Sequence, residues 1–203
     1  MPLDQFRELR VALEHLHGAT PTVIEYAGQE LATSLGNMRK ATTGVLTFNT
    51  ERIDILIQQV IRSNHYIEAV SFAHVDRSFW PTEGARQYLE AQQIAIADRR
   101  VVVTRIFVAE RLDVVQEEMD RQRAIGVVTL YLPEAIVLQE ERLDFGVFDG
   151  VTCYQSGPNL YGIVTEALLY TDSSTISSRR ALFARLRSRA TLIEAGGHTS
   201  GQH

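Results

Sequence analysis

The sequence predicts an α/β protein with a mainly parallel sheet, built from βαβαβ crossovers followed by a β-hairpin and preceded by an N-terminal helical appendage. Three observations lead to this fold class. Strand-like apolar runs alternate with helical patterns between positions 50 and 132. An Asp-Gly pair at 149–150 lies between alternating apolar residues, which is typical of a hairpin. The first part of the chain carries an amphipathic helix stripe that includes Phe6, Leu9 and Leu13.

Each element of the main domain follows from its residue pattern. A wide apolar face at Ile53, Ile57 and Ile61 predicts a helix. Further helices are expected over 82–97, 113–124 and 174–193. Strands are expected over 66–73, 100–109, 126–132 and 160–170. Because alternating strands and helices favour right-handed crossovers, we expect parallel pairing in one α/β domain over 46–193, with a helical appendage over 1–45 and a flexible tail over 194–203.

The composition is that of a globular protein with a sizeable core. Apolar residues make up 45% and charged residues 22%, and the net charge of −5 gives no overall attraction to nucleic acid or anionic lipid. The single cysteine, Cys153, excludes an intramolecular disulfide and falls in an expected strand, so we expect a buried thiol in a reducing compartment. No signal-peptide core is present, and no apolar run reaches the ~20 residues that span a bilayer. These features predict a cytoplasmic protein without a membrane partner.

The predicted hairpin lies in the stretch ERLDFGVFDGVTCYQSGPNLYG, at 141–162. It can be a turn alone, since Asp-Gly suits a turn whose two central residues have positive φ. Its spacing nevertheless resembles the second part of the HKD motif of the phospholipase D superfamily, which runs His-x-Lys, Asp and then Gly-Ser-x-Asn. Asp149 stands at the motif's Asp, Ser156 falls in its Gly-Ser pair and Asn159 stands at its Asn. The expected βαβαβ order also matches one half of that fold.

The resemblance implies a phosphodiesterase site whose catalytic residues are replaced. Arg142 stands at the position of the nucleophilic His, and Asp144 stands at the position of the phosphate-binding Lys. A guanidinium does not deprotonate in proteins, and a carboxylate repels phosphate, so we expect no hydrolysis of the phospholipase D type. Because the family's complete site joins two half-motifs across a two-fold axis, one half-motif per chain implies a homodimer.

A second group of functional side chains follows the first of the expected parallel strands, in AHVDRSFWP at 73–81. Ligands of open α/β sheets bind beyond the carboxyl ends of the strands. His74 offers a base, Asp76 a carboxylate and Arg77 an anion-binding fork. Trp80 offers a stacking surface, and Glu110 ends the next strand, so both are expected on the same rim.

Each of these residues also has a structural alternative. His74 can be a satisfied structural residue, and Asp76 can cap the following helix. Trp80 can cover the sheet edge as part of the core, and Glu110 can be a carboxylate at a helix start. The candidate ligand-binding residues are those of the strand-end group and of the half-motif: His74, Asp76, Arg77, Trp80, Glu110, Asp149, Ser156 and Asn159.

The last expected helix carries many arginines, namely Arg179, Arg180, Arg185, Arg187 and Arg189. They can form a nucleic-acid face, but no Lys-rich extension accompanies them, which favours a solvated outer face. Neither metal-ligand spacing nor a Gly-rich phosphate loop is present, so no metal or cofactor is expected.

These patterns favour a non-catalytic phospholipase D-like module that senses or binds a small molecule or a protein partner as a dimer. One alternative is an enzyme that uses His74, Asp76 and Arg77 for acid/base chemistry on a small anionic or aromatic substrate. A further alternative is a nucleic-acid-associated regulator, although nucleic acid is not the expected partner.

Overall fold

The computed structural model describes residues 11, 20–21, 24–25, 27–29, 32, 36, 42–48, 52–158 and 163–193. The chain divides into two compact units, Met1–Thr43 and Gly44–His203. Most of the expected helical appendage and the whole expected tail over 194–203 lie outside the described residues. The second unit contains the α/β domain, and its first strand begins at Val45.

The second unit is built on one sheet, whose described strands follow the order β1-β7-β6-β5-β2-β3-β4-β8. The strands are β1 (Val45–Phe48), β2 (Tyr66–Phe72), β3 (Val102–Ala109), β4 (Val128–Pro133), β5 (Asp144–Phe148), β6 (Thr152–Pro158), β7 (Val164–Tyr170) and β8 (Thr191–Leu192). Only β2–β3 and β3–β4 are parallel among these neighbours, while the other five pairs are antiparallel.

The prediction of an α/β fold is therefore confirmed, but the prediction of a mainly parallel sheet is wrong. Strands alternate with helices only from β2 to β4, and this part does pair in parallel. The hairpin β5–β6 then adds its strands to the side of β2 away from β3, and β7 follows antiparallel to β6. Of the five antiparallel pairs, β5–β6 and β6–β7 join strands that are consecutive in the chain, as hairpin returns do, whereas β1–β7, β2–β5 and β4–β8 join strands that are far apart in the sequence.

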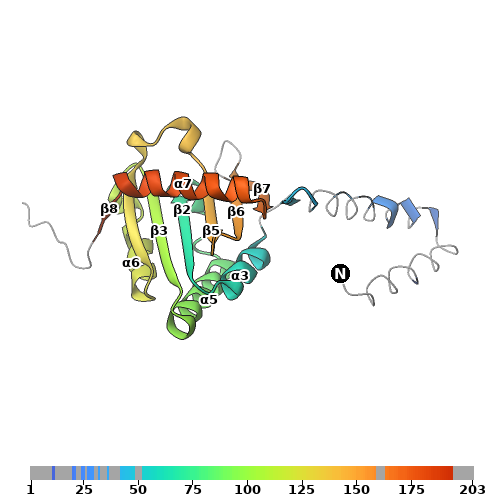
Figure 1. Cartoon of the computed structure of the whole chain (residues 1–203), viewed down its shortest axis with the longest axis horizontal. Helices are drawn as coiled ribbons and strands as arrows, with labels where there is room; N and C mark the ends of the chain where they lie inside the picture. Colours follow the sequence, from blue (N-terminus) through green and yellow to red (C-terminus); the bar gives the residue numbers. More distant parts are fainter. Residues whose placement is uncertain are drawn as a thin grey trace, which may run out of the picture. The chain divides into compact units, whose positions relative to one another are not determined.

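Helices cover both faces of the sheet (Figure 1). The helices of the second unit are α3 (Ile53–Arg62), α4 (Ala73–Asp76), α5 (Glu83–Arg99), α6 (Gln116–Ala124) and α7 (Ser173–Arg189), with single 3-10 turns η2 (Leu112–Val114), η3 (Glu134–Ile136) and η4 (Gln139–Glu141). Of the described helices, none is long and apolar enough to cross a membrane. Helix α7 lies across one face, and α3, α5 and α6 pack against the other.

The two faces are separated by the alternation of side chains along each strand. On β3, Ile106 and Val108 join the core under α7, whereas Val103 and Phe107 join the cores under α5 and α6. This alternation follows from the period of two in an extended chain. The same period directs Arg105 to the α5 side, where it meets Tyr88.

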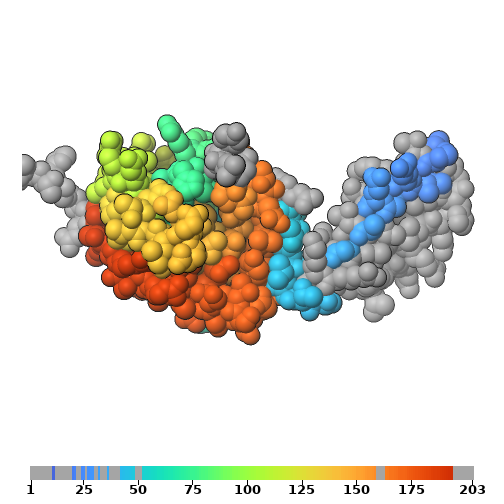
Figure 2. Space-filling model, turned by 90° about the horizontal axis from the view of Figure 1, so that it is seen from above, coloured from blue at the N-terminus to red at the C-terminus, as the bar shows by residue number. Residues whose placement is uncertain are grey.

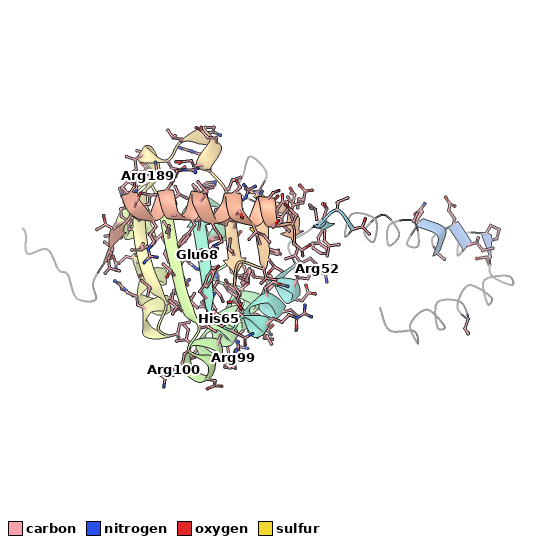
Figure 3. The ribbon with its side chains drawn as sticks, in the orientation of Figure 1. Arg52, His65, Glu68, Arg99, Arg100 and Arg189 are labelled. Carbon is pink, nitrogen blue, oxygen red and sulfur yellow. The ribbon has the colours of Figure 1, made fainter. Side chains whose placement is uncertain are left out.

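Helix α7 is held to the sheet by its arginines as well as by its apolar face. Arg189 donates to Glu141 at 2.6 Å, and Arg180 lies 3.7 Å from the Glu68 carboxylate on β2. Figure 3 shows Glu68 on the strand beneath α7 and Arg189 at the far end of the helix. The helix ends at Arg189, earlier than the expected residue 193, because Ala190 is extended and the next two residues form β8 against β4.

The Asp149-Gly150 turn has the backbone that the sequence predicts. Asp149 has φ 51° and Gly150 has φ 67°, and the Val151 N–H donates to the Phe148 carbonyl at 2.9 Å. The Asp149 carboxylate also accepts the backbone N–H groups of residues 64, 65 and 66 at 2.7, 2.9 and 2.8 Å. Burial by itself would raise the pKa of Asp149, but these three bonds bring it below the ordinary 3.8. Asp149 thus ties the hairpin to the start of β2.

The first prediction tests how much these three hydrogen bonds to Asp149 contribute to stability. Asp149→Asn keeps the size and the left-handed backbone but replaces one acceptor oxygen by a donor that faces N–H groups. We expect the free energy of unfolding at neutral pH to fall by about 1–3 kcal/mol in chemical denaturation. A carboxyl whose pKa is lower in the folded than in the unfolded state stabilises the fold when the pH lies above its unfolded pKa. The difference in unfolding free energy between Asp149→Asn and wild type should therefore shrink as the pH falls below 3.8. A difference that stays constant in acid would contradict this role, and the exposed Asp98→Asn is the control.

The second prediction concerns Cys153, which is 0% exposed under α7. Burial raises the pKa of its thiol to about 12. We expect no reaction with a thiol reagent in the native protein at neutral pH, and complete reaction after denaturation. As the sequence holds one cysteine, the labelled fraction reports this residue alone. Rapid labelling of the folded protein would contradict the burial of the thiol.

Candidate functional site

The candidate site lies where β2 and β3 end, on the face of the sheet that carries α5 and α6. Figure 2 looks onto this end of the molecule and shows the segments after β2, β3 and β4 gathered there. The chain leaves β2 through the short helix α4 and a turn that contains Phe79 and Trp80. Phe79 is 8% exposed and anchors the turn, and the Thr82 hydroxyl caps α5 by accepting the Ala85 N–H at 3.1 Å. Thr82 therefore takes the capping role that Asp76 could have had.

A cavity of about 40 Å³, which we call the inner cavity, lies beneath this turn. Its floor is formed by small residues of three neighbouring strands, namely Ala69, Ser71, Gly146 and Ser156. Its walls are large side chains, among them Phe79, Trp80, Tyr88 and Tyr154. The cavity exists because small side chains on the sheet leave room that the bulky residues above cannot fill.

Arg105 is the central polar residue of the inner cavity. It comes from the middle of β3 and is 2% exposed. Its guanidinium lies 5.0 Å from the Trp80 ring centroid and 5.4 Å from that of Tyr88, and its Nη2 donates to the Tyr88 hydroxyl at 2.8 Å. These contacts hold the guanidinium against two aromatic rings. The Nε–H of Arg105, however, is buried without a hydrogen-bond partner in the described part of the chain.

Tyr88 remains a neutral donor in this environment. Burial raises the pKa of its hydroxyl. The charges of Asp76 and Asp144 also raise this pKa, whereas Arg105 lowers it. Since the Tyr88 oxygen accepts from Arg105, its own O–H remains available for a second bond. The inner cavity therefore offers two donors, from Arg105 and Tyr88.

Two carboxylates also line the inner cavity. Asp144 begins β5, accepts the Phe72 N–H at 3.0 Å and stands opposite Ser156 in the β5–β6 register. Asp76 ends α4 and also borders the neighbouring cavity. The β5–β6 hairpin thus contributes Asp144 and Ser156 to the same cavity as the strand-end residues Asp76 and Trp80.

A second cavity of about 340 Å³, the outer cavity, lies on the other side of Asp76 and Trp80, which line both. Phe107, Val114 and Val115 supply its apolar wall, and Arg77 and Glu118 supply its polar groups. Burial raises the pKa of Glu118, although Gln122 donates to it at 2.8 Å and Arg121 lies 3.0 Å away. Trp80 also borders a third cavity of about 390 Å³ toward Arg86 and Arg121.

The structure thus brings together Asp76, Arg77, Trp80 and Ser156 of the residues that the sequence singled out. His74 is exposed and does not line the inner or the outer cavity. Its ring makes a T-shaped contact with Phe72, with 5.7 Å between the two ring centroids. Glu110 is likewise exposed and lines neither of them. Asp149 lies at the opposite end of β2, and Asn159 lies outside the described residues.

Sequence reasoning missed Arg105, Tyr88 and Glu118 as site residues. Arg105 had a visible signal, because a charged residue in the middle of the apolar run VVVTRIFVA requires a buried partner. Tyr88 and Glu118 lie on helices whose sequences give no such signal. Within the described part of the chain, no group of three or more His, Cys, Asp or Glu side chains could hold a metal ion.

Comparison with known proteins gives likeness in structure alone. No protein-family model matches the chain, and no curated protein matches its sequence. Nuc from Salmonella typhimurium, a phospholipase D family member, has a TM-score of 0.56 at 10% identity, covering 74% of this chain and 98% of that one. TrmBL2, an archaeal chromatin protein with a novel mode of DNA binding, has a TM-score of 0.50 at 11% identity over 88% of this chain and 71% of that one.

NucT from Helicobacter pylori has a TM-score of 0.48 at 12% identity, covering 70% of this chain and 90% of that one. At such identities the likeness concerns the fold and not the chemistry. The match to nearly the whole of Nuc agrees with the fold that the sequence resemblance implied. The chain has a phospholipase D-like fold.

Proposed function

We propose that the protein is a non-catalytic phospholipase D-like module that binds a small molecule in the inner and outer cavities. The observation that carries this proposal is the buried Arg105, which lines the inner cavity and whose Nε–H has no hydrogen-bond partner among the described residues. A buried charged donor costs stability unless something accepts its hydrogen bond. The inner cavity is covered by Asp76, Phe79 and Trp80 from the segment after β2, at the carboxyl end of a parallel strand, which is where open α/β folds bind ligands.

In this proposal the half-motif no longer carries its catalytic residues. Arg142, at the position of the nucleophilic His, donates to Glu134 at 2.8 Å and does not line the inner cavity. Asp144, at the position of the phosphate-binding Lys, does line it. A carboxylate there opposes the binding of a phosphodiester, so the pocket is suited to a different ligand.

The position of His74 removes the main support for the alternative of an acid/base enzyme. The proposed reaction needs His74 and Asp76 near the same substrate, but only Asp76 lines the inner and outer cavities. A general base has to lie within hydrogen-bond reach of the proton that it removes. Binding without catalysis therefore agrees better with the geometry.

The nucleic-acid alternative draws on the arginines of α7 and on the likeness to TrmBL2. Several of these arginines are engaged with the domain itself. Arg179 donates to Gln155 at 3.0 Å, Arg189 donates to Glu141 at 2.6 Å, and Arg180 stacks on Tyr66. Since these side chains hold α7 in place, they are less available to phosphates, and small-molecule binding is the better-supported function.

The third prediction tests binding through Trp80, the only tryptophan of the sequence. Addition of a small-molecule extract from the host should change the intrinsic fluorescence of the purified protein, because Trp80 borders the inner and outer cavities. Native mass spectrometry should show the mass of the bound compound. Arg105→Lys, which keeps the charge but lacks the guanidinium fork, should weaken this binding, whereas the exposed Arg62→Lys should not.

Absence of both the emission change and the added mass would contradict ligand binding. A phosphodiesterase activity that co-purifies with the protein and disappears in Asp144→Asn would contradict the non-catalytic part of the proposal. The two results are independent, since binding without turnover and turnover without stable binding are separately observable.

The fourth prediction concerns assembly. One half-motif per chain implies that two copies associate, so we propose a homodimer. Light scattering at micromolar concentration should give twice the mass of 22.8 kDa. A mass of one chain over the whole concentration range would remove this part of the proposal without affecting the binding of a ligand within one chain.

A further inference from the structure

The outer cavity is large enough to hold a small molecule by itself. Its volume of about 340 Å³ is typical of ligand pockets, whereas the inner cavity, at about 40 Å³, holds roughly three water-sized groups. Most of the residues that line the outer cavity are apolar, namely Ala73, Trp80, Phe107, Val114 and Val115. Val114 is 57% exposed, so this wall is open to solvent. A ligand of the outer cavity therefore needs an apolar body.

Three charged residues complete the lining, and the two acids among them already have partners. Glu118 accepts a hydrogen bond from Gln122 at 2.8 Å with one carboxylate oxygen, and its other oxygen lies 3.0 Å from Arg121. Asp76 also has an interaction within the chain. Neither carboxylate is thus without a partner, and neither requires a cationic ligand.

Arg77, the third charged residue of the lining, is different. Its backbone N–H donates to the Ala73 carbonyl at 3.1 Å, which holds the main chain at the end of α4 beside the cavity. The residue is exposed, and its guanidinium makes no hydrogen bond, ion pair or aromatic contact with another described residue. Because no such contact holds the guanidinium in one orientation, its donors are available to a ligand in the cavity that Arg77 lines.

The third cavity, which also borders Trp80, has arginines that are already compensated. Arg86 donates to the Glu83 carboxylate at 2.8 Å. Arg121 is the arginine that lies 3.0 Å from Glu118. Of these three cavities, the outer one therefore combines an apolar wall with a cation that has no described partner.

Arg77 determines the charge of the ligand. Carboxylates and phosphates are the anions that match the guanidinium fork. A phosphate monoester carries about two negative charges near neutral pH, and its second charge would find no further unpaired cation in the lining. A monocarboxylate supplies the single charge that Arg77 can pair.

We infer that the outer cavity binds a small monocarboxylate with an apolar body. Its carboxylate accepts hydrogen bonds from Arg77, and its body lies against Phe107 and Trp80. This inference rests on the proposed small-molecule binding and adds the chemical class of the ligand.

The fifth prediction tests this class with cyclohexanecarboxylate as the probe and the emission of Trp80, which lines the outer cavity, as the signal. Cyclohexanecarboxylate should change the emission in a saturable manner. Cyclohexylmethanol, which has a neutral hydroxyl, and cyclohexylmethylamine, which is a cation, should each bind about tenfold more weakly or worse. Propionate, which lacks the ring, should give no saturable change. Added salt should weaken the binding of the acid but not of the alcohol, because salt screens an exposed ion pair.

Two variants separate the carboxylate from the apolar body. Arg77→Gln should lower the affinity for cyclohexanecarboxylate to that for cyclohexylmethanol and leave the alcohol unaffected. Val114→Ser, which removes apolar surface from the wall, should weaken both ligands by a similar factor. The matched control Arg62→Gln, at another exposed arginine, should change neither. Arg77 and Val114 are both exposed, so the variants should fold, and circular dichroism checks this.

Equal or tighter binding of the alcohol or the amine would overturn the inference, as would an affinity for cyclohexanecarboxylate that Arg77→Gln leaves unchanged. A protein whose emission responds to the host extract but not to cyclohexanecarboxylate would also overturn it, while the proposed binding function would stand. A protein that responds to neither would lose both.

Discussion

The guanidinium of Arg105 joins the parts of the structure that form the candidate site. It extends from the middle of β3 to the Tyr88 hydroxyl on α5 and lies against the ring of Trp80 in the turn after α4. A cation that is 2% exposed requires partners, and these two aromatic residues supply them from one side. The strand, the helix and the turn are thereby held around one group. The Nε–H is left without a hydrogen-bond partner among the described residues, and Arg105 is one of the residues that line the inner cavity.

The β5–β6 hairpin has a different role at each end. At its turn, the Asp149 carboxylate binds three successive backbone N–H groups at the start of β2, which is a structural task. At its open end, Asp144 and Ser156 pair in register and line the inner cavity. One short segment therefore sets the position of β5 in the sheet and also supplies the polar floor of the candidate site. The Asp-Gly turn and the cavity-lining residues Asp144 and Ser156 thus belong to the same hairpin.

Electrostatic pairing also explains how the arginine-rich helix α7 fits a protein with a net charge of −5. The Arg189 guanidinium holds the pKa of the Glu141 carboxyl below its usual range. Burial raises the pKa of Glu68 under the same helix, although Arg180 opposes this effect. The arginines thus compensate acids of the sheet and of the segment after β4. The sequence showed their number but not these partners.

The sequence by itself determined the type and place of most elements. The apolar face of Ile53 and Ile57 is a local pattern, as are the alternation in β3 and the Asp-Gly turn, and each needs only neighbouring residues to be recognised. Tertiary structure decided the direction of the strands, because parallel or antiparallel pairing depends on where the chain returns to the sheet. It also decided which polar residues meet: Asp76 faces the inner cavity while His74, two residues earlier, is exposed. Arg105 became part of the site only through the register that turns it toward α5, and such a register is fixed by contacts between residues far apart in the chain.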